Sequence, residues 1–148
     1  SMEEPEADGL VSIDKEWDVV RDYVSLHQMR YERPIFVLLQ LKNEYPEQSM
    51  PTLVLLSLLE NIFKHGEIFK EDKPALFQLQ TEEHGWSLMI SNSHRLSKAS
   101  LEKSGIGIRG IEARLRSTYG PDGYKLFVTD TESTYKLHII VHSKHVTS

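Results

Sequence analysis

The segment LLENIFKHG, residues 58–66, places four polar residues in an apolar stretch: Glu60, Asn61, Lys64 and His65. Glu60 and Lys64 are one helical turn apart, and so are Asn61 and His65, so a helix would group all four on one side. Such a group is either a solvated helix face, with a Glu–Lys pair contributing about a few tenths of a kcal/mol, or one wall of a binding site. Charged faces are commonplace, which favours the first alternative. Asn61 is the exception, because asparagine is a mediocre helix former with little reason to lie mid-helix.

Two glycines, Gly105 and Gly107, precede a segment with helical periodicity and are separated only by Ile106. Glycines at such a place let backbone amides approach an anion, and the start of the following helix adds the positive end of its dipole. The spacing is neither that of a G-x-x-x-x-G-K-[ST] phosphate loop nor that of a dinucleotide fingerprint, since no strand runs straight into it. A tight turn is the alternative explanation, so these glycines alone are weak evidence for an anion site.

A helix from Pro51 to Gly66 is predicted to position the polar stripe. Proline is favoured in a first helical turn, and glycine can end a helix in the left-handed conformation. The buried side of this helix is marked by Val54, Leu55, Leu58, Leu59 and Ile62. An earlier helix is predicted from Ser12, a capping residue, to the helix-breaking Pro34, and residues 35–42 form a short apolar strand.

The second half of the chain alternates with the period of two that is typical of strands. Four segments are predicted strands, in two hairpins: 75–82 with 86–92, and 123–130 with 134–142. Between the hairpins lie a polar loop, residues 93–104, and the glycine-rich start of a further helix. Helices and strands interleave, but the last strands are linked as a hairpin, so the sheet should be mixed. These features predict an α/β fold, a two-layer α/β sandwich.

The composition is that of one globular domain. The 148 residues are enough for a real core, and the net charge of -5 argues against a general nucleic-acid binder. The absence of cysteine excludes disulfides and thiolate metal sites and fits a reducing compartment. No run approaches the roughly 20 apolar residues that span a bilayer. Residues 1–11 are expected to be a tag-cleavage scar and an acidic linker before an excised fragment, and residues 12–148 a single domain.

Together the two motifs resemble a known family. MPTLVLLSLLENIFKHG, then a strand ending in ISN, a polar loop and GIGIRGIEARLRSTYG are similar to the ATP-binding domain of sensor histidine kinases. These belong to the GHKL ATPase superfamily, with gyrase and MutL. DKEWDVVRDYVSLHQMRYE resembles the helix before the ATPase core in the branch that signals to LytTR-type response regulators. The resemblance extends from residue 12 to about residue 142. It implies the Bergerat fold, with a mixed, mostly antiparallel sheet and helices on one face.

The resemblance implies roles for the residues of the polar stripe. Asn61 would bind Mg²⁺, a hard cation that prefers oxygen ligands and shares its shell with the nucleotide phosphates. Glu60 would be the catalytic residue that polarises a water or the attacking group. Lys64 and His65 match residues that approach the phosphates. The stripe would then be the Mg–phosphate wall of a nucleotide site.

The resemblance also implies roles for the glycine motif and the loop before it. Gly105 and Gly107 would bring backbone amides to the phosphates at the start of the helix that contains Ile108. Residues 93–104 would form the ATP lid. The lid carries three cations, for which solvated loop charges are the simpler explanation: Arg95, Lys98 and Lys103.

Two positions depart from the family pattern. Asn92 stands where relatives commonly have an aspartate that binds the exocyclic amine of adenine, and no glycine follows it in SNSHR. An asparagine oxygen can still accept that hydrogen bond, although a weaker one without full charge. Gly110 stands where relatives often carry asparagine. The departures are compatible with nucleotide binding and put efficient turnover in question.

The resemblance therefore implies the catalytic domain of a protein-histidine kinase of two-component signalling. With ATP and Mg²⁺ as cofactors, it would donate the γ-phosphoryl group to a histidine on an upstream dimerisation helix. None of the seven histidines matches such an acceptor motif. The expected partners are the histidine-bearing dimerisation domain of the same kinase and a downstream response regulator, and no nucleic acid. The domain is expected to be cytoplasmic, in a homodimeric protein anchored in the inner membrane.

Two other functions remain open at this point. A degenerate, non-catalytic GHKL module acting through protein contacts is motivated by Asn92 and Gly110. An anti-sigma-type serine kinase is more distant, because the helix before the core and the RLRSTYG segment favour the histidine-kinase branch. A zinc site is rejected: His138 and His142 fall on one face of a strand, but no third ligand is evident.

Overall fold

A five-stranded sheet forms one layer of the molecule, with the order β2-β4-β5-β7-β6. Its strands are β2 (Val37–Lys42), β4 (Ala75–Glu82), β5 (Gly85–Ser93), β6 (Tyr124–Asp130) and β7 (Thr134–His142). Strand β2 pairs with β4 in parallel, and the other neighbouring pairs of this sheet are antiparallel. The computed structural model describes residues 9–95 and 105–142.

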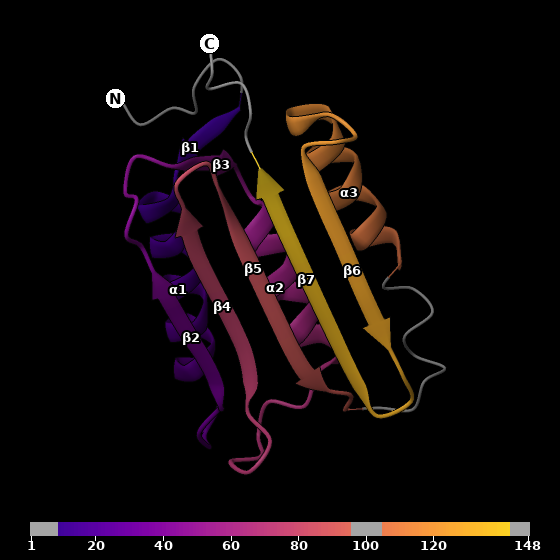
Figure 1. Cartoon of the computed structure of the whole chain (residues 1–148). Helices are drawn as coiled ribbons and strands as arrows, with labels where there is room; N and C mark the ends of the chain where they lie inside the picture. The colour runs from indigo at the N-terminus through magenta and orange to yellow at the C-terminus, as the bar shows by residue number, and fades with distance from the viewer. Residues whose placement is uncertain (1–8, 96–104, 143–148) are drawn as a thin grey trace.

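Three helices form the second layer: α1 (Ile13–Arg30), α2 (Val54–His65) and α3 (Gly105–Tyr119). Figure 1 shows α1 and α2 behind the sheet, with α3 on the side of β6. Alternate residues of the central strands are buried against the helices, among them Phe77, Leu79, Leu88, Ile90, Leu137 and Ile139. The period-two pattern thus gives the sheet one apolar face, which the helices cover. The predicted two-layer α/β sandwich with a mixed, mostly antiparallel sheet is confirmed.

Helix α1 begins as the sequence predicts. Ser12 is its N-cap, and the Ser12 hydroxyl accepts a hydrogen bond from the Lys15 backbone N–H (3.2 Å). Near its end, the His27 ring stacks on Tyr23 with centroids 4.3 Å apart and lies 4.6 Å from the Phe63 ring of α2. His27 therefore packs between the two helices, and its contact with Phe63 joins α1 to α2.

The predicted start of α2 at Pro51 is wrong. Pro51 belongs to the short strand β3 (Ser49–Pro51), which pairs antiparallel with β1 (Leu10–Ser12). The helix begins only at Val54, after Leu53 has turned the chain in the left-handed conformation (φ 66°). The Leu53 N–H donates to both carboxylate oxygens of the buried Glu16, at 3.1 and 3.2 Å. A carboxylate from α1 therefore fixes the start of α2, which no local pattern reveals.

The end of α2 is at the predicted place for a different reason. Gly66 is extended (φ -89°, ψ 161°) rather than left-handed, and its N–H donates to the Ile62 carbonyl at 2.7 Å. A β-carbon at this position would lie 2.8 Å from that oxygen and 2.9 Å from the Asn92 amide nitrogen. Close approach by neighbouring atoms, and not backbone conformation, requires glycine here.

The remaining boundaries bear on the site. Both predicted hairpins are confirmed, as β4–β5 and β6–β7. Helix α3 begins at Gly105, so the two glycines lie in its first turn rather than before it.

Residues 96–104 of the predicted lid lie outside the described residues. Strand β1 extends across the predicted domain boundary at residue 12, and that boundary stays a prediction. In the described part of the chain, no helix is long and apolar enough to cross a membrane.

Candidate functional site

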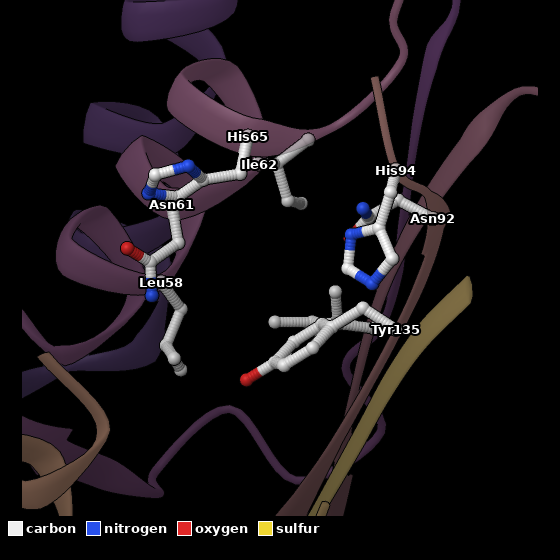
Figure 2. A pocket seen from close by; sticks show the side chains of 8 residues that line it. Leu58, Asn61, Ile62, His65, Asn92, His94 and Tyr135 are labelled. Atoms are coloured by element: carbon white, nitrogen blue, oxygen red, sulfur yellow. The ribbon is translucent and has the colours of Figure 1, made fainter. Parts of the chain in front are cut away.

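A pocket lies between α2 and the ends of β5 and β7 (Figure 2). Its lining comes from α2 (Leu58, Asn61, Ile62, His65), from β5 and the residue after it (Ile90, Asn92, His94) and from β7 (Tyr135). The cavity volume is about 20 Å³, room for about one water molecule.

The polar stripe of α2 divides into two pairs at this pocket. Asn61 and His65 line it beside Leu58 and Ile62, because these positions share one face of the helix. Glu60 and Lys64 each precede one of these two residues by one position. Successive side chains point in different directions around a helix, so Glu60 and Lys64 do not line the pocket. Glu60 lies towards α1, since burial and then the Glu60 carboxylate raise the pKa of Tyr23. Lys64 is exposed.

His65 lies in a region of positive charge. Partial burial lowers the pKa of His65 below its usual value, and the neighbouring Arg95, Lys64 and His94 lower it further. Arg95 is close because its backbone N–H donates to the His65 carbonyl at 3.0 Å and its guanidinium donates to the Lys64 carbonyl. The residues directly after β5 are thus tied to the last turn of α2. The two cations beside His65, Lys64 and Arg95, are suited to an anionic ligand.

Asn92 closes the pocket on the β5 side and is only 6% exposed. Its Nδ2 donates to the Ser93 carbonyl at 3.1 Å, so the Oδ1 remains the acceptor of this side chain. The adjoining backbone is joined to the end of α2, because Glu67 N–H donates to the Ser93 carbonyl (2.8 Å) and Gly66 forms a bridge with His94. The side chain predicted to contact adenine therefore lies against the end of the helix that carries Asn61.

The glycine motif meets the stripe at Asn61. A β-carbon built on Gly107 would lie 3.6 Å from Asn61 Nδ2 and 3.8 Å from Asn61 Oδ1. The first turn of α3 therefore faces this amide, although the two residues are far apart in the chain. Ile108 is partly buried and packs against the core instead of lining the pocket. A β-carbon on Gly110 would meet no atom of the described residues within 4 Å.

Two pocket residues were not identified from the sequence as site residues. His94 falls in the segment predicted as a lid, where it is one of several scattered histidines, and Tyr135 occupies an ordinary strand position. His94 Nε2 lies 2.8 Å from Asp130 Oδ1, and its side chain is only 3% exposed. Burial and then the Asp130 carboxylate raise the pKa of Tyr135 to about 12. The nearness of His94 to the strand end was the only available signal, and the pairing with Asp130 required the fold.

The remaining predicted cations fall outside the site as described. Lys98 and Lys103 lie outside the described residues, so their expected phosphate contacts stay predictions. In the residues that the structure describes, no three histidine or acidic side chains come together as a metal site. Any cation in this pocket would have to complete its coordination with ligand atoms, as Mg²⁺ does with nucleotide phosphates.

The fold itself matches solved structures. The catalytic domain of histidine kinase ThkA, in a nucleotide-free form, superposes with a TM-score of 0.60 at 8% identity, over 90% of this chain and 97% of that domain. Histidine kinase AdeS of Acinetobacter baumannii superposes with a TM-score of 0.59 at 12% identity, over 91% of this chain and 66% of that one. This chain has the fold of histidine kinase catalytic domains.

The sequence comparison points the same way. The sensor histidine kinase/phosphatase LytS of Staphylococcus aureus is 24% identical in an alignment of 139 residues that covers 84% of this chain. The match takes in only 24% of LytS, so the chain spans about a quarter of the length of this curated relative. No protein-family model matches the chain. The resemblance to the ATP-binding domain of sensor histidine kinases, predicted from the two motifs, is confirmed by these comparisons.

Proposed function

We propose that this chain is the ATP-binding catalytic domain of a two-component sensor histidine kinase. It would transfer the γ-phosphoryl group of ATP to a histidine on a dimerisation helix that this chain does not contain. The position of Gly107 facing the Asn61 amide supports the proposal most strongly, because it brings the glycine-rich helix start to the polar stripe in a fold shared with histidine kinase catalytic domains.

The residues around this contact fit a magnesium nucleotide. Asn61 offers an amide oxygen, which is a ligand that Mg²⁺ accepts, and it lies beside the first turn of α3. The N–H groups of that turn have no helical acceptor and are suited to phosphate oxygens. His65 stands one turn after Asn61 in a region of positive charge. When bound, Mg²⁺ would neutralise charge that develops on the phosphoryl oxygens.

The other end of the pocket fits a nucleobase. Leu58, Ile62 and Ile90 supply apolar surface for its faces, and the Asn92 Oδ1 is an acceptor for an exocyclic amine. In this arrangement the base would lie between α2 and β5, and the phosphates would extend towards the first turn of α3. Glu60 lies next to Asn61 but outside the pocket lining, and in this proposal it would orient an acceptor group that comes from another domain.

The wider assembly is part of the proposal. The domain would work on a histidine-bearing helix of its own kinase and through it on a response regulator. The whole protein would be a homodimer anchored in the inner membrane, with this domain in the cytoplasm. Support comes from the resemblance to sensor histidine kinases, of which LytS is one by name.

Calorimetric titration with a non-hydrolysable ATP analogue and Mg²⁺ tests the binding step. We expect the wild type to bind and Asn61→Ala to lose most of the Mg²⁺-dependent affinity, about tenfold or more. Gln40→Ala is the matched control, because it also removes an amide but lies exposed on the sheet face away from the helices. Failure of the wild type to bind, or equal affinity of Asn61→Ala and the wild type, would contradict the proposed site.

Phosphotransfer to a separately supplied, histidine-bearing dimerisation domain tests the chemistry. We expect transfer from ATP, and a decrease of about 10²-fold or more in Glu60→Gln, which keeps the size of the side chain but removes its basicity. Nucleotide binding without any transfer to histidine would favour the non-catalytic module instead. Transfer to a serine of a partner protein would favour the serine kinase.

A further inference from the structure

The His94 ring is held in position from two sides. Its Nε2 lies 2.8 Å from Asp130 Oδ1, and its backbone N–H donates to the Ser133 carbonyl at 3.0 Å. Because the carboxylate can only accept, Nε2 carries the proton. In the neutral imidazole, Nδ1 is then a hydrogen-bond acceptor with a fixed direction. Figure 2 shows the ring turned towards the α2 wall of the pocket.

Two buried polar atoms of the pocket have no hydrogen-bond partner among the described residues. They are His94 Nδ1 and the Tyr135 hydroxyl oxygen. The two rings are neighbours, with centroids 6.4 Å apart, and both line the pocket. Buried polar atoms are nearly always paired, so two unpaired ones at one small pocket indicate a ligand that supplies both partners.

The strand register places these atoms beside Asn92. Tyr135 is the cross-strand partner of Asn92 on β5 and of Asp130 on β6. The three side chains therefore form a row across β5, β7 and β6, and His94 closes the row by its contact with Asp130. Asn92, the residue that departs from the family's aspartate, thus has two further polar groups beside it.

We propose that His94 Nδ1 and the Tyr135 hydroxyl recognise the edge of adenine in the bound nucleotide. Nδ1 accepts a hydrogen bond from the exocyclic amine, and the hydroxyl donates to N1 of the ring. In hypoxanthine a carbonyl oxygen replaces the amine and would face the lone pair of Nδ1, so this base is rejected. His94 is then a specificity residue that supports Asn92 where a carboxylate is missing. This inference rests on the proposed function.

The pocket must widen for the base to enter. A cavity of about 20 Å³ holds about one water molecule, far less than a purine. His94 is fixed by its backbone and by Asp130, whereas the His65 ring on the opposite wall is only half-buried. We therefore expect His65 to turn outward while His94 keeps its place.

Titration with the Mg²⁺ complexes of ATP and ITP analogues that cannot be hydrolysed tests the inference. ITP carries hypoxanthine, so it differs from ATP at the edge that His94 and Tyr135 would contact. We expect the wild type to bind the ATP analogue about tenfold or more tightly than the ITP analogue. His94→Leu should lower the affinity for the ATP analogue about tenfold and that for the ITP analogue little, so the ratio approaches one. Tyr135→Phe should reduce the ratio in the same direction.

His84→Leu is the matched control, because His84 is exposed at the tip of the β4–β5 hairpin and its removal should leave the ratio unchanged. Thermal unfolding identifies any variant that does not fold. If His94→Leu does not fold, the ratio of affinities measured for Tyr135→Phe tests the inference by itself. Ratios equal to that of the wild type in the folded variants would overturn the recognition of adenine by these residues while leaving the proposed function intact. No binding of either nucleotide by the wild type would overturn the proposed function itself.

Discussion

Gly66 and Asn92 lie so close together that any side chain at position 66 would press against Asn92. A β-carbon on Gly66 would lie 2.9 Å from Asn92 Nδ2 and 3.2 Å from Asn92 Cγ. Asn92 is buried, and Gly66 is the residue that ends α2. The glycine therefore determines how closely the helix that carries Asn61 approaches the strand that carries Asn92. This spacing sets the width of the pocket.

Gly66→Ala should destabilise the protein by about 1–3 kcal/mol, because the added methyl group must displace the Asn92 side chain or the end of α2. It should also weaken binding of the ATP analogue. Gly110→Ala is the control: an added methyl group there meets nothing within 4 Å, and alanine favours the helix by up to about 1 kcal/mol. Urea denaturation of both variants gives the comparison. Equal stability of Gly66→Ala and the wild type would show that the close contact relaxes freely.

Gly107→Ala should separate folding from binding. The new methyl group would be in ordinary contact with the Asn61 amide, at 3.6 Å, so the protein should fold and α3 should gain up to about 1 kcal/mol. The same methyl group would lie between α3 and the atom proposed to hold Mg²⁺, and affinity for the magnesium nucleotide should fall. Calorimetric titration of Gly107→Ala and Gly110→Ala with the magnesium nucleotide measures the two affinities. Equal affinities in the two variants would show that phosphates do not lie between α3 and Asn61.

Leu53→Gly should stabilise the protein by up to about 1 kcal/mol. Leu53 is the only described residue other than glycine with a positive φ, and 55% of its surface is exposed. Relief of the left-handed conformation, which costs an L-residue roughly 1–2 kcal/mol, outweighs the added freedom of glycine in the unfolded chain. Leu26→Gly is the opposite control, because this leucine is also exposed (61%) but lies in α1, where glycine costs about 1 kcal/mol. Thermal denaturation should move the two variants in opposite directions.

Glu16 should make stability depend on pH in a defined direction. Burial raises the pKa of Glu16 above 4.5, an effect only partly offset by the Leu53 N–H and by Arg114. Because the unfolded chain releases this proton first, the contribution of Glu16 is fully present below pH 4.5 and is lost as pH rises through the folded pKa. Glu16→Gln keeps an acceptor for Leu53 and cannot ionise. Its free energy of unfolding should therefore increase relative to that of the wild type as pH rises over this window. Urea denaturation at a series of pH values measures both free energies, and a constant difference between the two proteins would contradict the prediction.

The sequence predicted the layers of the fold because they depend on local patterns. Period-two alternation identified both hairpins, and the Ser12 cap marked the start of α1. The start of α2 was missed because it depends on Glu16, a residue of another helix. Proline at position 51 was compatible with a helix start and with a short strand, and only pairing with Leu10 decided between them.

The sequence by itself determined that Glu60, Asn61, Lys64 and His65 share one helix and that a glycine-rich helix start follows later in the chain. It could not determine which of the four face the pocket, because spacing fixes the angles between side chains on a helix but not the rotation of that helix against the sheet. Packing of the apolar side of α2 set that rotation, so Asn61 and His65 line the pocket and Glu60 and Lys64 do not. The approach of Gly107 to Asn61 likewise required the packing of α3 beside α2, and the contact of His94 with Asp130 required the register of β6 against β7.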